Sequence, residues 1–142
     1  MTEQLLTWFN TLPVNQLFGL QCVQLHGDGA VVEVAVRDNH RNPDGSVSGA
    51  ILSGAADLAA GVAVTAVNQN YDSATGNLNM HFLAPAKKSP LRIEVEILHR
   101  GRRTCVPQVR IYDATGRFCT IATGTWLLRD TQVDYQKLRH TD

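Results

Sequence analysis

Residues 40–64 read HRNPDGSVSGAILSGAADLAAGVAV, and this stretch decides the fold. Its first part contains Asn-Pro-Asp-Gly at 42–45, which is typical of irregular backbone, because proline fixes one dihedral angle and the other three residues tolerate turns. From Gly49 to about Val67 nearly every residue is Ala, Gly, Val, Leu or Ile. This run is too long for a strand and predicts a helix. Ser48 precedes it and is the expected N-cap, since its hydroxyl can accept from a free amide of the first turn.

Asp57 is the one charged residue in the predicted helix. A carboxylate in apolar surroundings is costly unless it finds partners. Its neighbours at helical spacing leave room beside it, because all are small: Ala50, Ser53, Gly54 and Gly61. Two interpretations stay open: a functional acid in a groove, or an acid that caps a loop or bonds a buried hydroxyl while the small residues allow close packing. A membrane span is disfavoured, since a central Asp costs about 2.5–3.5 kcal/mol on insertion and basic flanks are missing.

The composition sets limits on the architecture and the partners. A chain of 142 residues is expected to form a single domain, 1–142. Charged residues make up 18%, below the usual share of about 25%, which suggests that another subunit covers part of the surface. The net charge is zero, so no bulk field favours nucleic acid or a membrane, and neither is an expected partner. The three cysteines have no metal-ligand spacing. Without a signal peptide they fit a reducing, cytoplasmic location.

The flanking segments predict a short helix and several strands. A near-helical apolar pattern indicates a helix over residues 2–12, ended by Pro13, and a polar, frayed tail is expected over 130–142. Strands are predicted from alternating apolar residues between turn signals, over 17–26, 30–36, 74–83, 91–98, 103–112 and 117–128. The first two would form a hairpin around Gly27-Asp28-Gly29. Pro107 implies a bulge or an edge position in its strand.

The order of these elements favours an α+β fold. One long apolar helix followed by consecutive strands with short connections predicts an antiparallel sheet and not a doubly wound one. The helix is apolar nearly all round, so it has to be covered on several sides. A strongly curved sheet wrapped around one long central helix would cover it in this way.

These motifs together resemble a known family. The pattern Asn42…Gly45-Ser-Val-Ser-Gly-Ala50…Asp57, with the later segments NMHFLAPAKK (79–88), HRGRRT (99–104) and RFCTIATGTW (117–126), resembles the hotdog-fold acyl-CoA thioesterases of the PaaI-like, phenylacetate-pathway type. The resemblance extends from about Leu17 to Leu128. It implies a hotdog fold and hydrolysis of a thioester to free acid and coenzyme A.

The resemblance also implies catalytic roles for four residues. The Gly49 amide, at the positive N-terminal end of the helix, would bind the thioester oxygen. Asp57 would be the general base for water, or the direct nucleophile that forms an anhydride, and the two routes stay open. Asn42 would hold the water or the substrate near Asp57. Thr75 falls where a hydroxyl residue of the family orients that water, although an ordinary β-strand threonine is an equal alternative.

A second group of residues is expected to bind the substrate. It comprises Ser48, Asn77, Phe82, Leu83, Ala84, Pro85, His99, Arg100, Gly101, Arg102, Arg103 and Thr104. Most of these resemble segments that touch the nucleotide part of coenzyme A, and guanidinium groups suit phosphate; the alternative is a solvated basic hairpin. No ligand constellation surrounds His81 or His99, so no metal is implied. No cofactor is expected either, because coenzyme A enters as part of the substrate.

One departure from the family keeps other functions open. The family usually has His-Gly-Gly at the start of the helix, where this chain has Ser48-Gly49-Ala50. A serine can cap the helix but cannot act as an imidazole, which puts efficiency and substrate choice in question. The alternatives are a non-catalytic acyl-CoA binding or regulatory module, and a hotdog dehydratase. The dehydratase would need a histidine paired with an acid, and the helix offers Asp57 without one.

The spacing of the two principal groups predicts a site shared between chains. Gly49 and Asp57 are eight residues apart, roughly 12 Å along a helix axis. The attacking atom must lie about 3–3.5 Å from the carbonyl carbon, so one chain cannot easily supply both groups. A two-fold partner with an antiparallel central helix could. We therefore expect a homodimer with shared active sites, and the resemblance implies pairing of dimers into a homotetramer.

Overall fold

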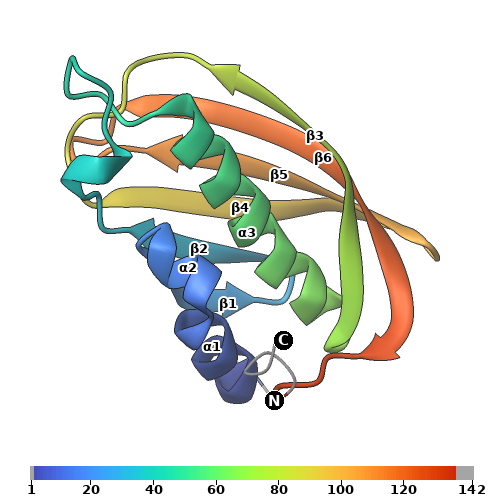
Figure 1. Ribbon diagram of the computed structural model, residues 1–142. Helices are drawn as coiled ribbons and strands as arrows, with labels where there is room; N and C mark the ends of the chain where they lie inside the picture. The colour runs from blue at the N-terminus through green and yellow to red at the C-terminus, as the bar shows by residue number, and fades with distance from the viewer. Residues whose placement is uncertain (1, 137–142) are drawn as a thin grey trace.

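Six antiparallel strands form one curved sheet in the order β1-β2-β4-β5-β6-β3 (Figure 1). The structure is a computed structural model that describes residues 2–136. The strands are β1 (Leu20–His26), β2 (Gly29–Val34), β3 (Tyr71–Phe82), β4 (Leu91–Arg100), β5 (Thr104–Tyr112) and β6 (Phe118–Gln132). One long helix, α3 (Gly49–Val67), crosses the concave side of the sheet. The predicted α+β fold, with a curved antiparallel sheet around one central helix, is confirmed.

Both ends of α3 are fixed by side chains. At the start, the Ala50 amide donates to the Ser48 hydroxyl over 3.2 Å, which confirms the predicted N-cap. At the end, the side-chain amide of Asn68 donates to the carbonyls of Asp72 (3.1 Å) and Arg129 (3.3 Å). The C-terminal end of α3 is therefore tied to β3 and β6.

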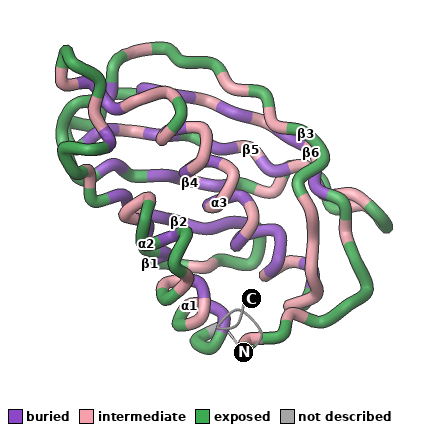
Figure 2. Tube along the Cα trace, viewed as in Figure 1, coloured by how far each residue is buried: buried purple, intermediate pink, exposed green. Residues whose placement is uncertain are grey.

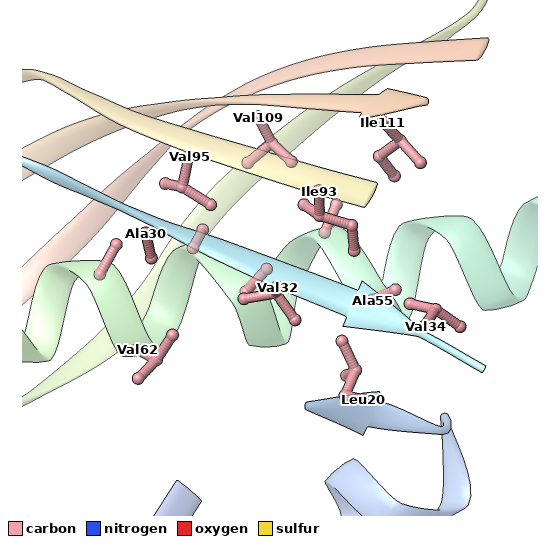
Figure 3. Packing of buried hydrophobic residues seen from close by; sticks show 14 of the residues in the cluster. Leu20, Ala30, Val32, Val34, Ala55, Val62, Ile93, Val95, Val109 and Ile111 are labelled. Atoms are coloured by element: carbon pink, nitrogen blue, oxygen red, sulfur yellow. The ribbon is translucent and has the colours of Figure 1, made fainter. Parts of the chain in front are cut away.

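The core fills the space between α3 and the middle strands (Figure 3). Strand residues at every second position point at the helix and are almost wholly buried, including Val32, Val34, Ile93, Val109 and Ile111. Small residues of α3 meet them, with Ala55, Ala59 and Ala63 at 0% exposure. By length and hydropathy alone α3 could cross a membrane, but its alanines pack on the sheet and make it the core helix of this fold.

One side of α3 is left open by the described residues. Only half of its most apolar window is buried, and a side chain at Gly61 would meet no atom within 4 Å. Asp57 and Ser53 lie on this side at intermediate exposure, and Ala50 is exposed. Figure 2 shows the neighbouring strand β3 as mostly intermediate and exposed, in contrast to the buried middle strands. The helix was predicted to be covered on several sides, and this is correct for every side of α3 except the open one.

Two short helices cover the β1 side of the molecule: α1 (Thr2–Thr11) and α2 (Pro13–Leu17). Pro13 ends the predicted first helix but also begins a second one, because proline is favoured in the first turn, where its missing N–H is not needed. For this reason the first strand begins at Leu20 and not at 17. The Asn10 side chain donates to the Cys22 carbonyl (3.1 Å) and accepts from the Cys22 amide (2.7 Å), so it occupies the outer edge of β1.

Several other predicted boundaries need correction. Strand β2 ends at Val34, two residues before the predicted end, and β3 begins at Tyr71, three residues early. Strand β6 continues to Gln132, so part of the predicted frayed tail is strand, and residues 137–142 lie outside the described residues. Pro107 sits opposite Ile97, next to a register shift in β4, and β5 is an interior strand. The bulge therefore lies in β4, opposite Pro107 and not in the strand of Pro107 itself, and the edge alternative for Pro107 is wrong.

Gly29→Ala is expected to destabilise the fold. A Cβ at Gly29 would come closer than 3.0 Å to the Val95 carbonyl oxygen, which belongs to the backbone of the neighbouring strand and cannot move aside cheaply. Overpacking of this kind costs about 1–3 kcal/mol, measurable as a lower urea midpoint. Gly27→Ala in the same turn is the control, because a Cβ there meets nothing within 4 Å. Equal stability of the two variants would contradict this packing.

Candidate active site

The N-terminus of α3 opens into a small cleft. Gly49 is the first residue of the helix, and among residues 2–136 its amide has no hydrogen-bond partner, as expected for the first turn. The exposed Phe82 ring lies beside it, 3.5 Å from where a Cβ would stand. The cleft has a volume of about 310 Å³ and is lined by Ser46, Val47, Gly49, Leu52, Phe82, Leu83, Ala84, Pro85 and Ala86. Gly49 and the predicted substrate residues Phe82–Pro85 are thus brought together, with the N-cap Ser48 next to them.

The loop before α3 is held by its own polar groups. The Ser46 amide and hydroxyl both donate to the Asp44 carboxylate, at 3.0 and 2.6 Å. These two bonds, the hydroxyl first, lower the pKa of Asp44 below its ordinary value of 3.8. The Val47 amide donates to the Ala86 carbonyl over 2.8 Å, which fixes the loop to the segment after β3. The Asn42 side chain donates to the Ser46 hydroxyl (3.1 Å), so in this structure it is bound to the loop and not to Asp57.

Asp57 and Thr75 meet on the open side of α3. The Thr75 hydroxyl, from β3, donates to Oδ1 of Asp57 over 2.6 Å. Within residues 2–136 the other oxygen, Oδ2, makes no hydrogen bond and stays available as an acceptor. The hydroxyl is exposed and not buried. Asp57 is therefore a partly exposed carboxylate, fixed at one oxygen, on a helix that is otherwise apolar.

Asn77 does not join this pair within one chain. A register shift between Thr75 and Asn77 sets Thr75 opposite the buried Trp126 but Asn77 opposite Thr125. Because neighbouring positions of β6 point to opposite faces of the sheet, Asn77 lies on the face away from α3. A sequence pattern could not show this, since the extra residue at Gly76 reverses the alternation.

The remaining predicted residues lie at the other end of α3. Arg100 donates to the side-chain oxygen of Asn68 over 3.3 Å, at the C-terminal cap of the helix. A cleft of about 920 Å³ lies here, lined by Asn68, Gln69, Tyr71, Arg100, Arg102, Arg103, Leu127, Leu128, Arg129 and Asp130. His99, Gly101 and Thr104 belong to the same hairpin end. A helix of 19 residues spans roughly 27 Å between its ends, so one chain does not bring this group to Gly49.

Sequence reasoning missed Arg129 in this basic cleft. Its strand, β6, runs beside the hairpin, and the Leu128 amide donates to the Arg103 carbonyl over 2.8 Å. The sequence could have indicated this position, because its last two predicted strands are antiparallel neighbours. Pairing of this kind sets the residues after 127 beside the start of β5 at Thr104. Four arginines therefore surround one cleft, where the prediction had three.

Metal-ligating and nucleophilic side chains do not gather elsewhere in the described part of the chain. Among residues 2–136 no group of three or more His, Cys, Asp or Glu side chains could hold a metal ion. All three cysteines are buried free thiols. Burial raises the pKa of Cys22 to about 11 and also raises the pKa of Cys105 and of Cys119. Thiols of this kind are poor nucleophiles at neutral pH.

Comparison with known proteins identifies the family. A sequence model of the thioesterase superfamily matches residues 44–120, more than half of the chain. The chain belongs to the thioesterase superfamily. It is a thioester hydrolase, as predicted. A protein of Saccharolobus solfataricus described as a "putative esterase" is 31% identical over 114 residues, which cover 80% of this chain and 81% of that protein.

Two solved structures share the fold. A hypothetical thioesterase from Streptococcus pneumoniae, crystallised with coenzyme A, has a TM-score of 0.74 at 26% identity over 80% of this chain and 88% of its own. The Escherichia coli PaaI protein of the phenylacetic acid degradation operon has a TM-score of 0.85 at 17% identity, over 94% of this chain and 96% of its own; at that identity the likeness concerns the fold. The predicted PaaI-like hotdog thioesterase is confirmed at the level of superfamily and fold.

Ser46→Ala is expected to raise the pKa of Asp44 towards 3.8, because the Ser46 hydroxyl is the largest cause of the lowered value. A folded-state pKa below the unfolded value means that Asp44 stabilises the loop above the unfolded pKa and loses this effect as the pH falls through the folded one. An NMR titration of the aspartate carboxyl carbons measures the change. Ser48→Ala is the control, because that hydroxyl accepts from Ala50. An unchanged Asp44 titration in Ser46→Ala would contradict the assignment.

Proposed function

We propose that this thioester hydrolase acts on acyl-CoA, with Asp57 as the base or nucleophile and the Gly49 amide as the group that polarises the carbonyl. The observation that carries the proposal is the Thr75–Asp57 hydrogen bond on the open side of α3. It leaves one carboxylate oxygen fixed and the other available. The streptococcal relative with coenzyme A supports the choice of substrate class.

The Gly49 amide is suited to a developing negative charge. Among the described residues it has no acceptor, and it lies at the positive end of a 19-residue helix. Glycine leaves the approach open, and Phe82 covers one side of the cleft. When the tetrahedral intermediate forms, the former carbonyl oxygen would accept from this amide. One such donor is worth about 2.7–4 kcal/mol of barrier.

The carboxylate of Asp57 would supply the nucleophile by one of two routes. As a base it takes a proton from water while the hydroxide attacks the thioester carbonyl carbon. As a nucleophile it attacks that carbon itself and forms an anhydride, which water then hydrolyses. In both routes the C–S bond breaks, and the free acid and coenzyme A leave. Thr75 holds the carboxylate in place by donating to Oδ1, and Asn42 would hold the water or the substrate. Neither route requires a separate cofactor.

Two chains are needed to assemble such a site. Gly49 and Asp57 are roughly 12 Å apart along α3 and, at 100° per residue, about 80° apart around it. The open side of α3 and the free outer edge of β3, which has no partner strand among residues 2–136, lie next to each other. An exposed edge strand of this length is a template for pairing. Antiparallel pairing of β3 with a second copy would bring Asp57 of one chain to Gly49 of the other.

In the same dimer, the basic cleft of one chain would lie close to the reacting groups and could bind the coenzyme A part of the substrate. With the two α3 helices antiparallel, the hairpin end of one chain, with Arg100, Arg102 and Arg103, lies near the Gly49 end of the other. Guanidinium groups there would bind the phosphates of coenzyme A, and Arg129 joins them from β6. A homodimer is therefore part of the proposal. Pairing into a tetramer and the contact of Asn77 with substrate stay predictions.

Asp57→Asn is expected to lower kcat by at least about 100-fold, because an amide is the same size but cannot act as a base. Steady-state assays with an acyl-CoA panel and a thiol reagent measure the change. Asp28→Asn, in the exposed β1–β2 turn, is the control and should keep the kcat of the wild type. A near-normal kcat in Asp57→Asn would make Asp57 structural. Tight acyl-CoA binding by the wild type without turnover would instead indicate a binding module.

Mixed dimers test whether the site is shared. Asp57→Ala and Gly49→Pro should each be inactive alone. Proline fits the first helical position, and Ser48 already has the extended backbone, φ −56° and ψ 138°, that a following proline requires. In a mixed dimer one site carries both changes and the other carries neither. Co-refolding is expected to restore activity up to about a quarter of wild type for random pairing. Mixed dimers without activity would rule out the shared site.

A further inference from the structure

The Phe18 ring is packed directly on the backbone of α3. Phe18 follows α2 and is at intermediate exposure. A Cβ at Gly54 would come closer than 3.0 Å to two carbons of this ring, Cε1 and Cζ, and the three nearest atoms to that Cβ all belong to Phe18. Gly54 is therefore a glycine because an aromatic ring occupies the place of its side chain.

The ring lies beside the stretch of α3 that separates the two proposed reacting groups. Gly54 precedes Asp57 by three residues, roughly 4.5 Å along the axis, and lies about 60° to one side of it. It follows Gly49 by five residues. Thr75 approaches Asp57 from β3, whereas Phe18 comes from the α2 side. A group lying over the small residues of the open side of α3 would thus have the Phe18 ring as one of its walls.

A set of hydrogen bonds holds the chain around Phe18. The Arg37 guanidinium donates to the carbonyls of Gln16 and Leu17, the last residues of α2. The buried His40 accepts at Nδ1 from the Arg37 amide (3.1 Å), which leaves its Nε2–H to donate to the Leu17 carbonyl over 3.0 Å.

The residue after Phe18 continues this anchoring. Gly19 has φ +67°, a conformation that favours glycine, and its carbonyl accepts from the Ala35 amide over 2.9 Å. The His40 carbonyl in turn accepts from the Ser48 amide at 2.9 Å, just before α3. The position of the Phe18 ring is therefore coupled to the same loop that places Gly49.

From this geometry we infer that Phe18 limits the size of the acyl group that the site accepts. The inference rests on the proposed function, in which Gly49 of one chain and Asp57 of the other meet over the open side of α3, and it adds that the acyl group lies over that side, beside Gly54. An apolar ring packed on the helix excludes volume on one side of that path and offers an apolar face to the acyl chain. Large acyl groups would meet the ring, and short ones would not.

The test compares kcat/KM across a saturated acyl-CoA series, from acetyl- to octanoyl-CoA. In Phe18→Ala the octanoyl-to-acetyl ratio of kcat/KM should rise at least about tenfold, the lower end of what one methylene decides in an apolar pocket. In Phe18→Trp the same ratio should fall. The affinity for free coenzyme A, measured by calorimetry, should stay at the wild-type value in both variants, because the ring acts on the acyl part.

Two further variants separate selectivity from stability. Phe9 lies on the buried face of α1 and does not contact Gly54. Phe9→Leu should therefore lower Tm but leave the octanoyl-to-acetyl ratio of kcat/KM at the wild-type value. Gly54→Ala should displace the ring and lower Tm relative to wild type. The same change made on top of Phe18→Ala should lower Tm less, because the new methyl group then occupies part of the space that the ring left. This double variant also keeps the test open if Phe18→Ala alone folds poorly.

The outcomes distinguish this inference from the proposed function. If the wild type hydrolyses acyl-CoA but Phe18→Ala has the same octanoyl-to-acetyl ratio of kcat/KM as the wild type, Phe18 is a structural residue and the inference is wrong. If the wild type hydrolyses no member of the series, the proposed function fails and the inference with it. Opposite changes of the ratio in Phe18→Ala and Phe18→Trp would support both.

Discussion

The burial of an apolar helix is the constraint on which the rest of the structure depends. A helix with no polar face has no side to present to water, so α3 has to be enclosed. The curved sheet covers its inner side through β2, β3, β4 and β5, and α1 covers part of another. Burial of each valine or isoleucine at this interface contributes about 1.5–3 kcal/mol. What is left uncovered is the side with Asp57, and the chemistry is expected there.

The two ends of α3 have different chemical characters. At Gly49 the helix offers an amide that has no acceptor among the described residues, beside an apolar cleft. At Asn68 it offers carbonyl groups beside four arginines. This polarity matches the helix dipole, which favours negative groups at the start and positive side chains at the end. A long substrate with a reacting carbonyl at one end and phosphates at the other needs both characters, at a spacing that its own length sets. One chain supplies both but keeps them a helix length apart.

The fold could be predicted from the sequence because its two main signals are local. The apolar run from 49 to 67 is too long for a strand, and residues 91–96 alternate between buried positions and exposed or half-exposed ones. The errors arose where one residue type serves two purposes or where contacts are distant. Pro13 both ends and begins a helix. Asn77 moved to the other face because Gly76 shifts the register. The Phe18 ring on Gly54 joins segments 36 residues apart, and such packing has no periodic signature.

The Asn10 side chain at Cys22 has a consequence for how the sheet can grow. Its amide makes the two hydrogen bonds that a neighbouring strand would otherwise make at that point of β1. Among the described residues, the sheet is thereby blocked at its β1 edge and free at its other edge, along β3. If β3 of one copy pairs with β3 of a second copy, the free edge of each copy is covered. Only the two blocked β1 edges then remain at the outside of the joined sheet. Such a sheet can close into a pair but cannot extend into a fibre.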